Sequence, residues 1–196
     1  MKNNEQVEIF NASINQNVLK SILTAEDVVA SINDNLDILL LIIPEIKPMI
    51  GFDHMHPHHH LDVWEHTLFA LSLSENDFDT RLVLLLHDIG KPHSWTFDGE
   101  VRHYNNHANV SASISREVLQ RLGFNDDYIN YICLFVKKHD DPITDKDILT
   151  SKDFSEKLFK IQICDCLAHN PEKNTSRLAY IDTVNNLLTI NQSIKQ

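Results

Sequence analysis

The sequence predicts an all-α protein, a bundle of helices with one minor β-hairpin near residues 95–104. Apolar residues recur at spacings of three and four positions through most of the chain, as they do in helices that bury one face. Alternation of apolar and polar residues, which marks half-buried strands, is scarce, and the 196 residues include only 4 Gly. The length and the 42% apolar composition suit a single domain with a well-buried core.

We expect this single domain to span residues 1–196 in three parts. Residues 1–50 form an N-terminal helical extension packed on the core, residues 51–171 form the core itself, and residues 172–196 form a C-terminal helix. The chain shows no internal repeat and no linker long enough to separate two domains.

The N-terminal extension is predicted to contain one weak helix and one strong one. Residues 1–21 are polar and rich in Asn, with weak helical signals. Thr24 and Asp27 then form a capping pattern, and apolar residues follow at helical spacing as far as residue 43. Pro44 and Pro48 end that helix, so a loop is expected over 51–60.

The helices of the core are bounded by capping residues and by glycine or proline. One helix is expected over Asp62–Ser74, and Asp79 is expected to cap the next, which ends at Gly90. The turn signal Asp98–Gly99 predicts the hairpin. Asn105 or Asn106 should cap the following helix, which runs to Leu122. The remaining helices are expected over 125–139, 153–170 and 175–190.

Charge and cysteine content limit the classes of function. The formal net charge is −11, from 28 acidic and 17 basic residues, so a broad nucleic-acid-binding face is not expected, although a local cation could still hold a small phosphorylated substrate. The 3 Cys fit neither a disulfide framework nor a zinc knuckle, and we expect buried thiols. Without a signal segment or a membrane-spanning apolar run, we expect a soluble cytoplasmic protein with no membrane partner.

A histidine and a carboxylate, His87 and Asp88, follow the apolar run Leu82–Leu86. Such polar groups at the edge of a core are costly unless a partner satisfies them, and a metal ion would satisfy both. Further residues that can bind metal lie beside the apolar stripes of other predicted helices. The complete candidate set is His66, His87, Asp88, His107, His139 and Asp165.

This candidate set is large enough for two ions. His66, His87, Asp88 and Asp165 suffice for one ion, and His107 and His139 would complete a second site with Asp88 as the bridge. Imidazoles and carboxylates bind divalent Mn, Fe, Ni, Co, Zn or Mg, and the residues do not choose among these metals. With a single ion, His107 and His139 would contact substrate or solvent instead. Two neighbouring ions can share a hydroxide and hold a phosphoryl oxygen.

The order His, His-Asp, Asp resembles the signature of the HD-domain metal-dependent phosphohydrolases. Four segments are similar in more detail to the HD region of bacterial CCA-adding tRNA nucleotidyltransferases, within a resemblance that covers about Leu36 to Pro171. These segments are Asp62–Leu68, Leu85–Pro92, His103–Ala112 and Asp165–Pro171. No nucleotidyltransferase head is found in this sequence, so the polymerase activity of those enzymes is not expected.

The resemblance implies an HD-type helical bundle and a hydrolytic binuclear metal centre. It implies a phosphomonoesterase or phosphodiesterase that acts on a nucleotide or another small phosphorylated substrate through metal-activated hydroxide. Asp88 and Lys91 would be the catalytic residues, with Lys91 also contacting phosphate. His59 would touch the substrate at the mouth of the site, whereas the other histidines of 54–60 are expected to form a polar loop.

Several alternatives stay open at this point. Asp62 could orient His66, supply an extra metal ligand, or be a solvated first-turn carboxylate. Trp95, Arg102 and His103 are weak candidates for lining the pocket. Some HD proteins use the same ligands to hold two irons and activate O₂, so a di-iron oxygenase is one alternative function. A nucleotide-binding or tRNA-associated HD module without catalysis is another. The oligomeric state is left open.

Overall fold

A computed structural model describes residues 2–193, with side chains described for residues 12–190. The ends of the predicted extension and of the predicted C-terminal helix, residues 1 and 194–196, lie outside the described residues. The helices are α1 (Lys2–Leu23), α2 (Val28–Asp34), α3 (Leu36–Ile42), α4 (Val63–Ser72), α5 (Phe78–Leu86), α6 (His107–Arg121), α7 (Asp126–Lys138), α8 (Asp145–Thr150), α9 (Lys152–Leu167) and α10 (Thr175–Ser193). The short 3-10 helices are η1 (Pro44–Met49), η2 (Lys91–His93) and η3 (Pro171–Lys173).

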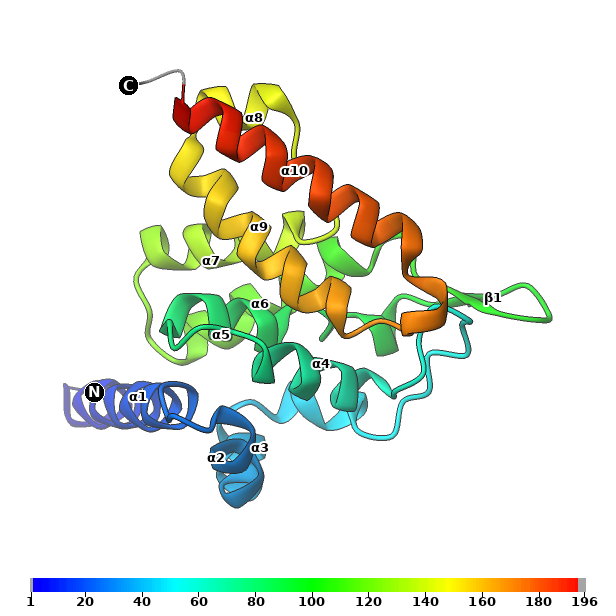
Figure 1. The fold of residues 1–196 in the computed structure, drawn as a ribbon. Helices are drawn as coiled ribbons and strands as arrows, with labels where there is room; N and C mark the ends of the chain where they lie inside the picture. The colour runs from blue at the N-terminus through cyan, green and yellow to red at the C-terminus, as the bar shows by residue number, and fades with distance from the viewer. Residues whose placement is uncertain (1, 194–196) are drawn as a thin grey trace.

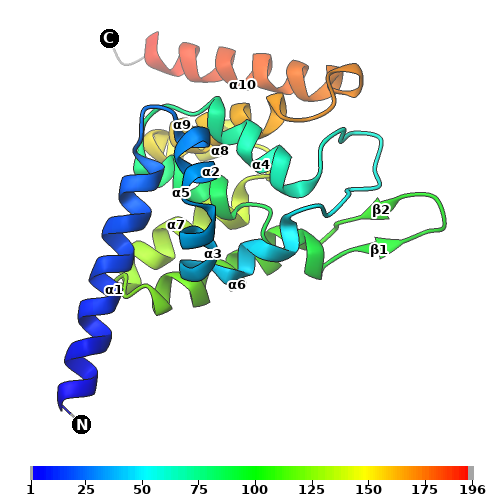
Figure 2. The same ribbon diagram turned by 90° about the horizontal axis from the view of Figure 1, so that it is seen from below.

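Helix α5 occupies the centre of the bundle. It packs against α1, α4, α6, α7 and α9, and all five residues of Leu82–Leu86 are fully buried. Helix α10 lies along α9 and α8 on one side of the molecule, and α1 runs along another side with its N-terminal end extending away from the bundle (Figures 1 and 2). The mostly helical fold class is therefore confirmed, while the division of the chain into extension, core and C-terminal helix stays a prediction.

The predicted hairpin is present and projects from the bundle beside the loop that precedes α4 (Figure 2). Strand β1 (Thr96–Phe97) pairs antiparallel with β2 (Arg102–His103). Gly99 takes a φ of 103° in the turn, a conformation that favours glycine. The guanidinium of Arg102 lies between the rings of Phe52 and Trp95, 4.6 Å from each centroid, and so attaches the hairpin to the loop.

Several helix boundaries differ from the predicted ones. Asp27, not Thr24, caps α2 by accepting a hydrogen bond from the Ala30 backbone. The long helix predicted as far as residue 43 is interrupted at Asn35, whose side-chain amide donates to the Ser31 carbonyl at 2.8 Å. A local bond of this kind satisfies the carbonyl without continuing the helix.

Two further differences concern α5 and α8. Asp77, not Asp79, caps α5 through the backbone and hydroxyl of Thr80. Asp79 instead accepts from the Tyr128 hydroxyl at 2.7 Å, so it joins α5 to α7. Helix α8 was not predicted, although Thr144 and Asp147 form a capping box at its start. None of the described helices is both long enough and apolar enough to cross a membrane.

Candidate metal centre

The candidate ligands stand on different helices and converge between α4, α5, α6, α7 and α9. His66 lies on α4, whose first turn is closed by a capping box between Asp62 and Glu65. The Asp62 side chain also accepts from the Gly51 backbone, so Asp62 is a capping residue. Its backbone carbonyl accepts from the His66 N–H, but no hydrogen bond joins the described side chains of Asp62 and His66. His87 is the C-cap of α5 and His139 is the C-cap of α7. Helix termini therefore position much of the cluster.

The carboxylate of Asp88 lies at the centre, with its two oxygens facing different histidines. Oδ2 is 3.2 Å from His87 Nε2 and 3.7 Å from His66 Nε2. Oδ1 is 3.4 Å from His107 Nε2 and 3.8 Å from His139 Nε2. Asp88 therefore divides the cluster into two halves and contributes one oxygen to each.

Asp165 completes the half of the cluster that contains His66 and His87. Its Oδ1 lies 2.9 Å from His66 Nε2 and 3.7 Å from His87 Nε2. Among the residues that the structure describes, three groups of donor atoms are compact enough to hold an ion. They are His66 with His87 and Asp88; Asp88 with His107 and His139; and His66 with Asp165 and His169.

All four predicted histidine ligands present the same ring nitrogen to the centre. The Nδ1 atoms of His87, His107 and His139 each lie 2.7 Å from a backbone carbonyl, and that of His66 lies 3.2 Å from one. A carbonyl can only accept, so each Nδ1 carries the proton, and in a neutral ring the Nε2 lone pair then points into the cluster. This arrangement is typical of histidines that bind metals through Nε2.

Several atoms in the cluster lack a protein partner that would satisfy them. His87 Nε2 and Asp88 Oδ1 are buried and form no hydrogen bond with the described residues, whereas Asp88 Oδ2 is ion-paired with the Lys91 ammonium at 2.7 Å. The Nε2 atoms of His107 and His139 lie 3.1 Å apart. Because Nδ1 is the donor in both rings, two lone pairs face each other unless a proton or a cation lies between them. Divalent cations would satisfy these atoms, so the residues present fit a metal centre.

The electrostatics of the buried carboxylates agree with that fit. Burial tends to raise the pKa of Asp88, but the charges of His87 and Lys91 hold it well below its usual range. Burial also opposes ionisation of Asp165, and His169 and His66 nevertheless keep its pKa well below the usual value. Burial lowers the pKa of His139, which favours the neutral ring that a metal requires. Burial tends to lower the pKa of His87, but Asp88 and Asp165 raise it to about 10, so an ion bound here would displace a proton from that ring. The anionic carboxylates and the neutral ring of His139 are suited to a cation.

Lys91 lies at the floor of the site and is 5% exposed. Its Nζ is 2.7 Å from Asp88 Oδ2 and 3.3 Å from His54 Nε2. His54 belongs to the histidine-rich loop that was expected to be polar, yet it is buried, whereas His58 and His60 are exposed. Its contact with Lys91 could not be read from the sequence because the loop precedes Lys91 by more than 30 positions.

Gly90 allows the segment that carries Asp88 and Lys91 to lie directly on α6. Its backbone N–H donates to Ser111 Oγ at 2.9 Å. A Cβ atom at this position would come within 2.8 Å of the His107 carbonyl and 2.5 Å of the Ser111 backbone nitrogen. The close contact between these two segments therefore requires glycine.

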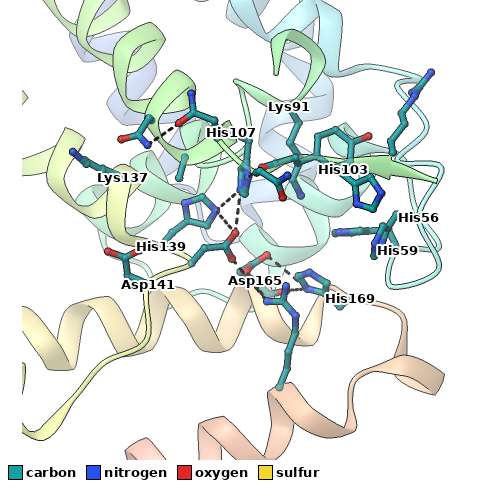
Figure 3. Close-up of a pocket in the computed structure, with 18 residues that line it drawn as sticks. His56, His59, Lys91, His103, His107, Lys137, His139, Asp141, Asp165 and His169 are labelled. Carbon is teal, nitrogen blue, oxygen red and sulfur yellow. Dashed lines mark hydrogen bonds and ion pairs between the residues drawn. The ribbon is translucent and has the colours of Figure 1, made fainter. Parts of the chain in front are cut away.

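A cavity of about 430 Å³ opens onto the cluster and is shown in Figure 3. In this view His139 lies at the left of the cavity, His56 and His59 lie at the right, and Lys91 lies next to His107 at the top. His59 stacks on His54 with ring centroids 3.6 Å apart and lines the cavity, where it was expected, but its contact with substrate stays a prediction. Arg102 and His103 also line the cavity, whereas Trp95 does not.

Sequence reasoning missed three residues that border the cluster. Asp140 Oδ2 lies 3.2 Å from His107 Nε2, His169 Nδ1 hydrogen-bonds to the Asp165 backbone carbonyl at 2.8 Å, and Arg177 Nη1 lies 3.8 Å from Asp165 Oδ2. His169 and Asp140 each follow a predicted ligand closely, and this proximity was the available signal. Arg177 comes from α10 and carried no such signal.

Comparison with known proteins gives one family match and two similar relatives. The model of the HD domain family matches residues 58–178. The CC-adding tRNA nucleotidyltransferase of Thermus thermophilus is 32% identical over 120 residues, which are 58% of this chain and 27% of that protein. The A-adding tRNA nucleotidyltransferase of Deinococcus radiodurans is 32% identical over 111 residues, 53% of this chain and 25% of that protein. The chain thus spans about a quarter of the length of these relatives, and the predicted resemblance is confirmed.

Proposed function

Because this chain belongs to the HD-domain family, we propose that it is a metal-dependent phosphohydrolase that acts on a small phosphorylated substrate, a nucleotide above all. One observation carries the proposal. Asp88 directs one carboxylate oxygen to His66 and His87 and the other to His107 and His139. A carboxylate shared in this way suits a binuclear centre.

The two halves of the cluster define the residues that would hold the ions. His66, His87, Asp88 and Asp165 would hold one, and Asp88, His107 and His139 would hold the other. Divalent ions bound here would lower the pKa of water and polarise a phosphoryl oxygen.

The protein supplies binding and charge around the centre. The Lys91 ammonium sits beside Asp88, where it can donate to a phosphoryl oxygen and stabilise negative charge that develops during hydrolysis. The cavity of about 430 Å³ suits a substrate of nucleotide size. The formal net charge of −11 argues against an extended surface that binds nucleic acid, so we expect the phosphorylated substrate to be held by local cations such as Lys91.

The decisive experiment strips the purified protein of metal, reloads it with Mn²⁺, Co²⁺, Ni²⁺ or Fe²⁺, and measures metal content and phosphate-ester hydrolysis together. We expect the reloaded protein to hydrolyse p-nitrophenyl phosphate, bis-p-nitrophenyl phosphate or a cyclic nucleotide. Asp88→Ala should abolish hydrolysis and lower the metal content. Asp182→Ala, the same change at an exposed position on α10, is the matched control.

Two results would contradict the proposal: full activity of Asp88→Ala, or full activity of the metal-stripped protein. Assays under nitrogen test the alternative chemistry of a di-iron oxygenase, which the same ligand types allow. A hydrolase keeps its activity without oxygen, whereas an oxygenase loses it. A protein that binds nucleotide and metal without turnover would be a non-catalytic module.

A further inference from the structure

We propose that Arg177 binds a second phosphoryl group of the substrate, so that the preferred substrates are nucleoside diphosphates or longer polyphosphates rather than monophosphates. This inference rests on the proposed function, because it places the first phosphoryl group at the metal centre. It assigns a binding role to α10, which contributes none of the candidate metal ligands.

Arg177 is held at the cavity by charge rather than by hydrogen bonds. Its Nη1 lies 3.8 Å from Asp165 Oδ2 and 3.9 Å from Asp140 Oδ1, and its side chain is 41% exposed. Both distances exceed the range of an N–H···O hydrogen bond. Among the described residues, no acceptor lies within hydrogen-bonding distance of the guanidinium, so its donor groups are available.

The other arginines of the described chain are all engaged. Arg81 donates to backbone carbonyls, and Arg102 donates to the Asp53 carbonyl. Arg116 donates to Asn130, and Arg121 holds Glu45 with two bonds of 2.7 and 2.8 Å. If Arg177 served only to neutralise carboxylates, we would expect it to bind one of them through two short hydrogen bonds, as Arg121 binds Glu45. Its longer distances favour a role toward a ligand.

The position of Arg177 complements that of Lys91. Both line the same cavity of about 430 Å³, Lys91 at the floor beside Asp88 and Arg177 beside Asp165. Asp88 and Asp165 both contact His66 and His87, so the two cations flank one set of candidate ligands. A substrate whose first phosphoryl group lies at these ligands would place an adjacent group within the reach of Arg177.

The surroundings of Arg177 also leave room for such a group. A second cavity of about 130 Å³ is bordered by Arg177, Asp140 and Tyr180, and Arg177 and Asp140 line the main cavity as well. A guanidinium is a planar fork that binds two phosphate oxygens at once. The carboxylates of Asp140 and Asp165 oppose anion binding when they are free, and an ion held by Asp165 offsets part of that charge.

The test compares inorganic pyrophosphate with inorganic phosphate as inhibitors of p-nitrophenyl phosphate hydrolysis by the full metal-loaded chain, with the free ion concentration buffered. We expect pyrophosphate to inhibit about tenfold or more tightly than phosphate, as one charge-assisted bidentate contact allows. Arg177→Gln should remove most of this preference. Arg116→Gln deletes the same charge and side chain at a site away from the cavity and should retain the preference.

A second variant separates binding from charge balance. Arg177→Lys keeps the positive charge beside Asp140 and Asp165 but loses the fork, and we expect it to recover only part of the preference for pyrophosphate. Full recovery would overturn the proposed bidentate contact. Equal inhibition of the wild-type protein by pyrophosphate and phosphate would also overturn the proposal.

Calorimetry distinguishes this inference from the proposed function. If no phosphate ester is hydrolysed with any ion, the proposed function fails, but pyrophosphate binding to the wild-type and Arg177→Gln proteins can still be measured. Weaker binding to Arg177→Gln supports the role of Arg177, and equal binding contradicts it. If phosphate esters are hydrolysed but both proteins bind pyrophosphate equally well, the proposed hydrolase function stands and the second phosphoryl site at Arg177 is contradicted.

Discussion

Nε2 of His54 accepts a hydrogen bond from the ammonium of Lys91 at a distance of 3.3 Å. The acceptor role is set on the other side of the ring, where Nδ1 donates to the Leu61 carbonyl at 3.0 Å. Burial and the charge of Lys91 lower the pKa of His54 to about 2, so the ring is neutral at physiological pH. His54 therefore holds Lys91 beside Asp88 as a positioning residue.

Replacing His54 should impair turnover without removing the ions. In His54→Phe the ammonium loses its second acceptor, and we expect kcat to fall about tenfold while the metal content stays constant. His54→Gln keeps an acceptor and should recover part of the rate. His60→Phe, at an exposed position in the same loop, is the control. An unchanged kcat in His54→Phe would show that Lys91 needs no support from this ring.

The depressed pKa of His54 also predicts that the stability of the protein depends on pH. An unfolded histidine binds a proton near pH 6.5, whereas folded His54 remains neutral down to about pH 2. Below pH 6.5 the unfolded state therefore binds more protons, and the free energy of unfolding should fall as the pH falls, by up to about 1.4 kcal/mol per pH unit for this group. Urea unfolding of chelator-treated protein between pH 7 and pH 5 measures the slope.

His54→Gln is the matched variant for that measurement. It removes the titrating group, so its slope between pH 7 and pH 5 should be shallower than that of the wild-type protein. The exposed residue His60 again provides the control, because His60→Gln should leave the slope as it is. Identical slopes for wild type and His54→Gln would show that His54 is not buried in the neutral form.

Gly90→Ala should destabilise the protein strongly for so small a change. The added methyl would meet backbone atoms of His107 and Ser111 at 2.8 and 2.5 Å, so α6 or the Asp88–Lys91 segment must move. We expect a loss of about 1–3 kcal/mol in the free energy of unfolding, together with weaker metal binding. The Ser111 hydroxyl also lies 2.8 Å from the added methyl, but two of the three obstructing atoms, including the nearest, belong to the backbone, so adding Ser111→Gly should not restore full stability. Restoration by the double variant would place the clash in the serine side chain.

Arg81 should be essential for attaching α1 to the bundle. It is 4% exposed, and its Nη1 donates to the carbonyls of Leu23 and Ala25 at 2.7 and 2.8 Å. Arg81→Met leaves these acceptors without a donor, and we expect a loss of about 2–4 kcal/mol in urea unfolding. Arg116→Met provides the comparison at a half-buried position, where only a solvent-exposed bond to the Asn130 side chain is lost, and should change stability by less than about 0.5 kcal/mol. A similar small change for Arg81→Met would contradict the role.

The sequence predicted those parts of the fold that depend on local signals. Asn125 caps α7 through the Tyr128 backbone, as its position before an apolar stripe indicated, and Asp98–Gly99 marks the hairpin turn. Where two local signals compete, packing decides. Asp77 and Asp79 are both plausible caps for α5, and Asp79 is instead recruited by Tyr128 of α7.

The candidate site, like the fold, was predictable where local sequence signals mark its residues. Histidines and carboxylates at helix ends beside apolar stripes identified His87, Asp88 and their partners, and these residues do lie together, although their role as ligands stays a prediction. His54 and Arg177 could not be identified. Their contacts with Lys91 and Asp165 depend on how a loop and α10 fold back on the bundle, which spacing along the chain does not encode.

The origin of the cluster from separate helices has a consequence for how the centre can be detected. The predicted ligands are spread from residue 66 to residue 165, so an unfolded chain cannot bring them together around one ion. An ion that binds only the folded state raises the free energy of unfolding, by about 2.7 kcal/mol at one hundred times its dissociation constant. The melting temperature should therefore rise with each fitting metal, and a thermal titration would rank the ions before any substrate is known.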